Sequence, residues 1–135
     1  MSAPANVEPR SVRPWWGFVT VLLVAAVFAQ AVFAGLMLSG VAWGQAAHSV
    51  NAIALLGTTF GAGLVALFTL RRVPHGLNFA FTLLALAVVL SLQTAIGKSS
   101  AGGANLLWLH VPLGVALVGL AMQTAASARR LGEIE

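Results

Sequence analysis

The sequence predicts an all-α integral membrane protein: a four-helix transmembrane bundle made of two repeated helical hairpins, with both termini cytoplasmic. Three observations predict it: the composition, four long apolar segments and the positions of the basic residues. Of 135 residues, 59% are hydrophobic and 7% are charged, which is far from the balance of a soluble domain. The only acidic residues are Glu8, Glu133 and Glu135, so the chain between Pro9 and Gly132 contains no carboxylate side chain.

The missing residue types exclude several kinds of chemistry. Paired-carboxylate hydrolysis, carboxylate proton relays and carboxylate-based Mg²⁺ or Ca²⁺ sites have no ligands in the apolar region. The chain has no cysteine, which excludes disulfides, iron–sulfur clusters and cysteine-based zinc sites. The net charge is +4, but the few basic residues flank apolar spans. They therefore orient a membrane protein and do not form a nucleic-acid-binding face.

Four apolar segments account for the predicted helices. Each meets the length of about 20 residues that a helix needs to cross a bilayer. A helix is the only plausible structure for them, because no water satisfies the backbone inside a membrane. Short connections favour antiparallel neighbours and a compact bundle. The segments are Trp15–Leu38, Ala46–Leu70, Leu77–Ile96 and Leu106–Ala128.

The basic residues predict the orientation in a bacterial cytoplasmic membrane. Six arginines flank the spans on one side, and Lys98 alone lies on the other. Because cytoplasmic flanks carry the excess of Lys and Arg, this split places both termini in the cytoplasm and the two hairpin loops outside. The arginines are Arg10, Arg13, Arg71, Arg72, Arg129 and Arg130.

The chain is expected to contain one folded domain. Residues 1–14 are predicted to be a disordered cytoplasmic tail, and residues 131–135 a short C-terminal tail. The transmembrane domain, 15–130, divides into the hairpins 15–72 and 77–130. The N-terminal span imitates a signal peptide, but its apolar run continues well past the small-residue site, so we expect it to be retained.

Rare polar residues recur at matching positions of the two hairpins. The segments HSVNAIALLG and HVPLGVALVG begin at His48 and His110, and Gln30 and Gln93 precede these histidines by 18 and 17 residues. A double arginine closes each hairpin. The matches predict a parallel repeat with its pseudo-two-fold axis along the membrane normal. The alternative is that composition alone produced two similar hairpins.

Helix arithmetic places both histidines near the outer surface. His48 lies 23 residues before Arg71, and His110 lies 19 residues before Arg129. At 1.5 Å per residue these separations are about 35 and 29 Å. Two facing imidazoles at one depth predict a haem b site, because neutral histidine is a common axial ligand and bundles commonly hold such sites between facing helices.

Three further residues complete the predicted haem site. Asn51 is expected to orient His48, and Gly114 to leave room beside His110. Lys98 is a candidate partner for a haem propionate. Each has a structural alternative: a cross-helix hydrogen bond for Asn51, close helix contact for Gly114 and an ordinary interfacial lysine for Lys98.

The remaining polar residues have simpler interpretations. A hydrogen bond between Gln30 and Gln93 is expected to join the first and third spans. The functional alternative is that these amides bond to a haem edge or a quinone oxygen. His75 lies in a Pro- and Gly-containing turn and is expected to be solvated.

The openings of the second and fourth spans, with His48 and His110, resemble one four-helix half of haem A synthase. They are also similar to a group of short four-span bacterial membrane proteins with the same His-Gly pattern. The resemblance covers nearly the whole chain and implies haem ligation by the histidine pair. Two features depart from the family: Gly44 stands where its catalytic half has a glutamate, and the outer-loop cysteine pair is absent. The resemblance therefore implies haem binding without haem oxidation.

Three functions remain open at this point. The first is electron transfer or haem holding, and the second is a non-catalytic accessory or scaffold role in a larger membrane complex. The third, a small transporter or channel, is disfavoured by the lack of intramembrane charge. The expected partners are the lipid bilayer and a membrane redox partner or complex. Gly- and Ala-rich faces would also permit a homodimer, and no catalytic residue is predicted.

Overall fold

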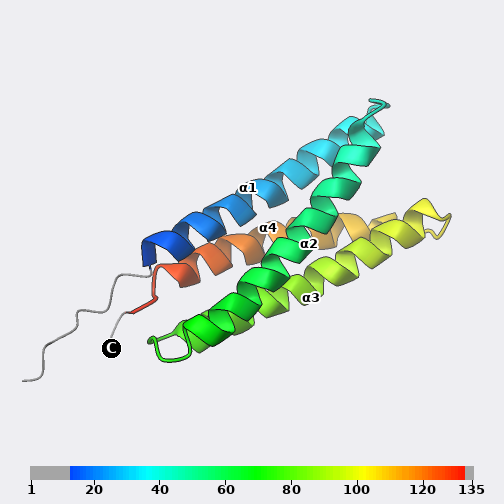
Figure 1. Cartoon of the computed structure of the whole chain (residues 1–135). Helices are drawn as coiled ribbons and strands as arrows, with labels where there is room; N and C mark the ends of the chain where they lie inside the picture. Colours follow the sequence, from blue (N-terminus) through cyan, green and yellow to red (C-terminus); the bar gives the residue numbers. More distant parts are fainter. Residues whose placement is uncertain (1–12, 133–135) are drawn as a thin grey trace, which may run out of the picture.

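The computed structural model describes residues 13–132, which form four long helices (Figure 1). All four are long and apolar enough to cross a membrane, which confirms the predicted all-α transmembrane class. Most of the two predicted tails, residues 1–12 and 133–135, lies outside the described residues. The helices are α1 (Arg13–Leu38), α2 (Gly44–Thr69), α3 (Gly76–Ala101) and α4 (Leu107–Ala128).

The helix limits agree with the predicted spans to within two residues, except at the end of α3. The third span was expected to end at Ile96, whereas α3 continues to Ala101. The added residues are small or polar, so the helix extends beyond its apolar run. Lys98 therefore lies in the last helical turn, where a cation is favoured by the helix dipole.

Pro112 lies inside α4, which begins five residues earlier at Leu107. A proline has no amide proton, so the carbonyl of Trp108 receives no hydrogen bond from position 112. The missing bond falls in the turn that contains His110.

The helices form a ring in which each helix packs against two others. α1 packs against α2 and α4, and α3 packs against the same two helices. Across the described chain, no Cα atoms of α1 and α3, or of α2 and α4, come within 8 Å of each other. α2 and α4 therefore face each other across the bundle, and so do α1 and α3.

The two ends of the bundle differ. Figure 1 shows the two hairpin loops, cyan and yellow, standing apart at one end. We call this the loop end. The start of α1, the end of α4 and the α2–α3 connection lie at the opposite, arginine end. The largest fully buried side chains lie in the arginine half or near the middle of their helices: Thr20, Thr59, Leu70, Phe79, Leu83, Thr124 and Leu131.

Candidate functional site

His48 and His110 lie near the loop end, on the two helices that face each other across the bundle. His48 is four residues after the start of α2, and His110 is three residues after the start of α4. Both histidines are half-buried. The structure places both histidines at the loop end, and the ring of His110 lies against Gly97 of α3.

Gln30 of α1 engages both ring nitrogens of His48. The backbone carbonyl oxygen of Gln30 lies 3.2 Å from Nδ1, and its side-chain amide nitrogen lies 3.2 Å from Nε2. The same amide donates to the backbone carbonyl of His48 at 3.0 Å. Because a carbonyl only accepts and an amide nitrogen only donates, the pattern assigns a neutral imidazole with its proton on Nδ1.

Asn51 completes this network from α2. Its amide donates to the side-chain oxygen of Gln30 at 2.7 Å and to the backbone carbonyl of Ala26 at 2.9 Å. Asn51 therefore makes the cross-helix bonds that were one of its two predicted roles. It acts on His48 through Gln30, whose amide now has a partner for both its nitrogen and its oxygen.

One hydrogen bond recurs in the second hairpin. The side-chain amide of Gln93 donates to the backbone carbonyl of His110 at 2.9 Å, as Gln30 donates to that of His48. These are the residues that the sequence alignment pairs. Each glutamine thus reaches the level of the histidine in its own hairpin.

The remaining bonds of the first hairpin have no counterpart in the second. Leu113 occupies the position that corresponds to Asn51, three residues after the histidine. The side-chain oxygen of Gln93 and Nδ1 of His110 are buried without a hydrogen-bond partner. An unsatisfied buried polar atom costs about 1–3 kcal/mol. Such atoms mark the place where a ligand or water would find partners.

Two glycines make room beside His110 and Gln93. A Cβ atom on Gly97 of α3 would lie 2.8 Å from Cε1 of the His110 ring, so only glycine lets the ring lie against α3. A Cβ atom on Gly114 would lie 3.2 Å from the amide nitrogen of Gln93. Gly97 was not anticipated, although its position one turn after Gln93 places it on the same helix face.

The predicted hydrogen bond between Gln30 and Gln93 is wrong. The helices that carry them, α1 and α3, face each other across the bundle, and in the described chain no Cα atoms of the two lie within 8 Å of each other. Their ring contact, Trp16 against Phe79, lies at the arginine end. Each amide bonds instead to the neighbouring helix of its own hairpin. Lys98 is exposed near the same end of the bundle, and its contact with a propionate stays a prediction.

Gly44 begins α2 at a close approach to α1. A Cβ atom there would lie 2.6 Å from the backbone nitrogen of Met37. Any side chain at position 44 therefore has no room in this turn.

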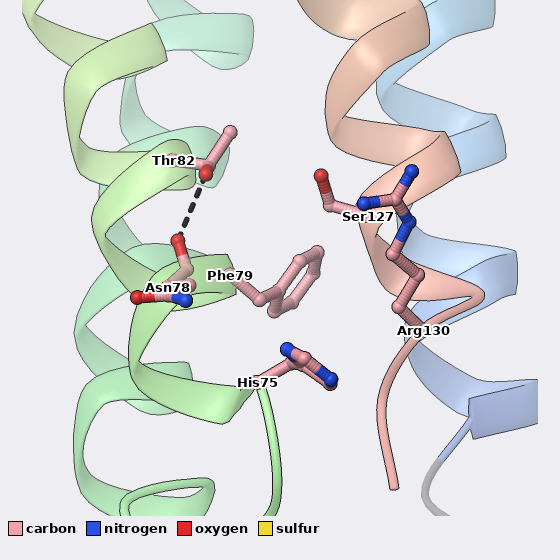
Figure 2. A pocket seen from close by; sticks show the side chains of 6 residues that line it. All are labelled: His75, Asn78, Phe79, Thr82, Ser127 and Arg130. Carbon is pink, nitrogen blue, oxygen red and sulfur yellow. Dashed lines mark hydrogen bonds between the residues drawn. The ribbon is translucent and has the colours of Figure 1, made fainter. Parts of the chain in front are cut away.

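His75, which was expected to be solvated, keeps part of its surface exposed. Its ring is half-buried and lines a pocket between α3 and α4 (Figure 2). The turn places it there because His75 adopts a left-handed backbone conformation, with φ of 60°.

No family model, curated protein or solved structure matches this chain. The resemblance to haem A synthase therefore rests on the residue pattern alone. Within residues 13–132, no three His, Cys, Asp or Glu side chains gather as a metal site. A bare transition-metal ion would lack ligands here, whereas haem iron needs at most two from the protein because the porphyrin supplies four.

Proposed function

We propose that this chain is a small integral membrane protein that binds haem b through His48 and His110 and serves electron transfer or haem holding. One observation carries the proposal. The two histidines lie near the loop end, on helices that face each other across the bundle. Among residues 13–132, none of the largest fully buried side chains lies at this end of the bundle. A bundle interior of this kind is a recurring place for bis-histidine haem.

The surroundings of each histidine suit axial ligation. Nδ1 of His110 has no hydrogen-bond partner in the protein. Hydrogen bonds within the bundle therefore do not occupy both nitrogens of this ring. His48 keeps its Nδ1 proton bonded to the carbonyl of Gln30. Bonds of this type fix the ring and tautomer of an axial histidine. When bound, the haem would supply a redox-active iron.

Before Nε2 of His48 can bind iron, it must lose its present hydrogen-bond partner. The side-chain amide of Gln30 occupies that nitrogen at 3.2 Å and would have to move aside. The Nδ1 bond to the backbone of Gln30 does not have to break. Gln30 would thus act as a positioning residue, holding the ring by its backbone while its side chain controls access to Nε2.

A visible spectrum of the purified protein tests this function. Protein from haem-replete cells should show a Soret band and sharp α-bands on reduction. Both features should be lost in His48→Ala and in His110→Ala. His75→Ala removes a histidine at the opposite end and should keep the spectrum. Wild-type protein that is folded but colourless would overturn the proposal.

We also propose that the two hairpins are a repeat and that the arginine end faces the cytoplasm. The recurring glutamine-to-histidine bond supports the repeat. The double arginines at the ends of α2 and α4 support the orientation. On this basis the haem would lie toward the outer face of the membrane, where Lys98 could pair with a propionate.

A second candidate function is a non-catalytic scaffold subunit of a larger membrane complex. The observation that favours it is the complete engagement of Gln30, His48 and Asn51 with one another and with the helix backbones. Such a network can simply lock α1 to α2. This function predicts colourless protein that migrates with a larger complex in native gels, and a His48→Ala variant that is less stable.

A further inference from the structure

A second polar site lies at the arginine end, between the start of α3 and the end of α4. It is a pocket of about 100 Å³, which admits a single small group. Figure 2 shows side chains reaching into it from both helices, with the ring of Phe79 against its inner side. The lining residues are His75, Asn78, Phe79, Thr82, Ser127 and Arg130.

The backbone around this pocket is held in place by close contacts. His75 adopts its left-handed conformation immediately before α3 begins. Gly76 approaches the backbone of Leu70 so closely that any Cβ atom would clash. The amide of Gly132 donates to the carbonyl of Pro74 at 3.3 Å. This last bond ties the segment after α4 to the turn before α3, so the two walls of the pocket are linked.

Both hydroxyl groups of the pocket already donate hydrogen bonds to backbone carbonyls. Thr82 donates to the backbone carbonyl of Asn78 at 2.8 Å (Figure 2), and Ser127 donates to that of Gln123 at 3.0 Å. The remaining donors are the Arg130 guanidinium, the Asn78 amide and the ring of His75. A ligand in this pocket must therefore be rich in acceptor oxygens.

The positive charge in the pocket favours binding of an anion. Arg130 is positive, and none of the residues that line the pocket is acidic. Its guanidinium is suited to bidentate contact with phosphate oxygens. Arg129, Arg71 and Arg72 cluster at the same end of the bundle, which is where the edge of the membrane is expected.

We propose that this pocket binds one phosphate group, either that of an anionic phospholipid headgroup or inorganic phosphate. Arg130 supplies the charge, and Asn78 and His75 add hydrogen bonds from the side of α3. Basic pockets between transmembrane helices bind anionic headgroups in this way. The site would anchor a lipid across the α3–α4 seam, and it is independent of any cofactor at the loop end.

Lipid retention by the full chain tests the proposal. The protein is reconstituted in phosphatidylcholine nanodiscs with and without phosphatidic acid, then extracted in detergent, and native mass spectrometry counts the retained lipids. Wild type should keep one phosphatidic acid. Arg130→Gln should lower its retention about ten-fold, as expected for losing a charge-assisted hydrogen bond, and Asn78→Leu should lower it less.

Arg129→Gln is the matched control, because it removes the same charge one residue away from a position outside the pocket lining. It should leave retention unchanged. Equal losses in Arg129→Gln and Arg130→Gln, or no retention by wild type of either phosphatidic acid or phosphate, would overturn the proposal.

Calorimetric titration with inorganic phosphate in phosphatidylcholine nanodiscs separates the two sources of the phosphate group. Binding that is abolished by Arg130→Gln would assign free phosphate. Lipid retention without phosphate binding would assign the headgroup. Should Arg130→Gln fail to fold, Arg130→Lys keeps the charge without the planar fork, and it should still lose retention.

Discussion

Gln30 contacts both ring nitrogens of His48, one through its side-chain amide and one through its backbone carbonyl, each at 3.2 Å. A single residue of α1 therefore sets the orientation and the tautomer of this ring. His110 has no such restraint, since Gln93 bonds only to its backbone and Nδ1 is left without a partner. The two histidines share a position in their hairpins but differ in the freedom of their rings.

The first prediction concerns the contribution of the Gln30 side chain to the free energy of unfolding. Its side chain takes part in three hydrogen bonds, to the ring and carbonyl of His48 and to Asn51. Interhelical bonds in membranes average about 0.6 kcal/mol, so Gln30→Leu should lower the free energy of unfolding by about 1–2 kcal/mol. Gln93→Leu, which removes one such bond, should cost about 0.6 kcal/mol. Reversible denaturation in mixed micelles measures both, and an equal or larger cost at Gln93 would contradict the structure.

The second prediction uses the difference between the hairpins. Leu113→Asn places an amide at the position corresponding to Asn51. In the first hairpin, Asn51 donates to the side-chain oxygen of Gln30, whereas the side-chain oxygen of Gln93 has no partner. We expect a gain in stability of about 0.5–1 kcal/mol, because the new donor satisfies a buried acceptor. The gain should disappear in a Gln93→Leu background, which a double-mutant cycle measures. A gain that persists without Gln93 would show that the amide bonds elsewhere.

The third prediction tests the close approach at Gly97. Gly97→Ala would put a methyl group 2.8 Å from Cε1 of His110, so the ring must move or the helices must part. Overpacking of this kind costs about 1–3 kcal/mol. Gly57→Ala is the matched control, because nothing lies within 4 Å of a Cβ atom at that site. If both variants unfold alike, His110 does not lie against α3.

The helices were predictable because membrane spans carry a strong signal in composition alone. Only the end of α3 was placed too early, at Ile96, since a helix can continue through small and polar residues once it leaves the apolar layer. The ring arrangement was harder to predict. Hydropathy does not say which helices face each other, and the expected Gln30–Gln93 bond depended on that choice.

The bond between Gln30 and His48 was predictable from the helix lengths. Gln30 lies eight residues before the end of α1, about 12 Å along the helix, and His48 lies four residues after the start of α2, about 6 Å. With the length of a glutamine side chain, these depths already allowed a bond within one hairpin. The pocket at His75 left no such signal, because it depends on a left-handed residue and on two helix ends that are distant in sequence.

The fourth prediction tests the orientation, and the natural sequence offers a clean background because it has no cysteine. Asn105→Cys lies in the exposed α3–α4 loop and should react with a membrane-impermeant maleimide in intact cells. Ser39→Cys, in the α1–α2 loop, should react as well. Ser2→Cys should react only after the membrane is permeabilised, because the six arginines favour cytoplasmic termini. Reaction of Ser2→Cys in intact cells, with protection of the two loop positions, would reverse the orientation and put the histidines on the inner side. If one loop reacts and the other does not, the two hairpins do not cross the membrane in parallel, and the repeat must be abandoned.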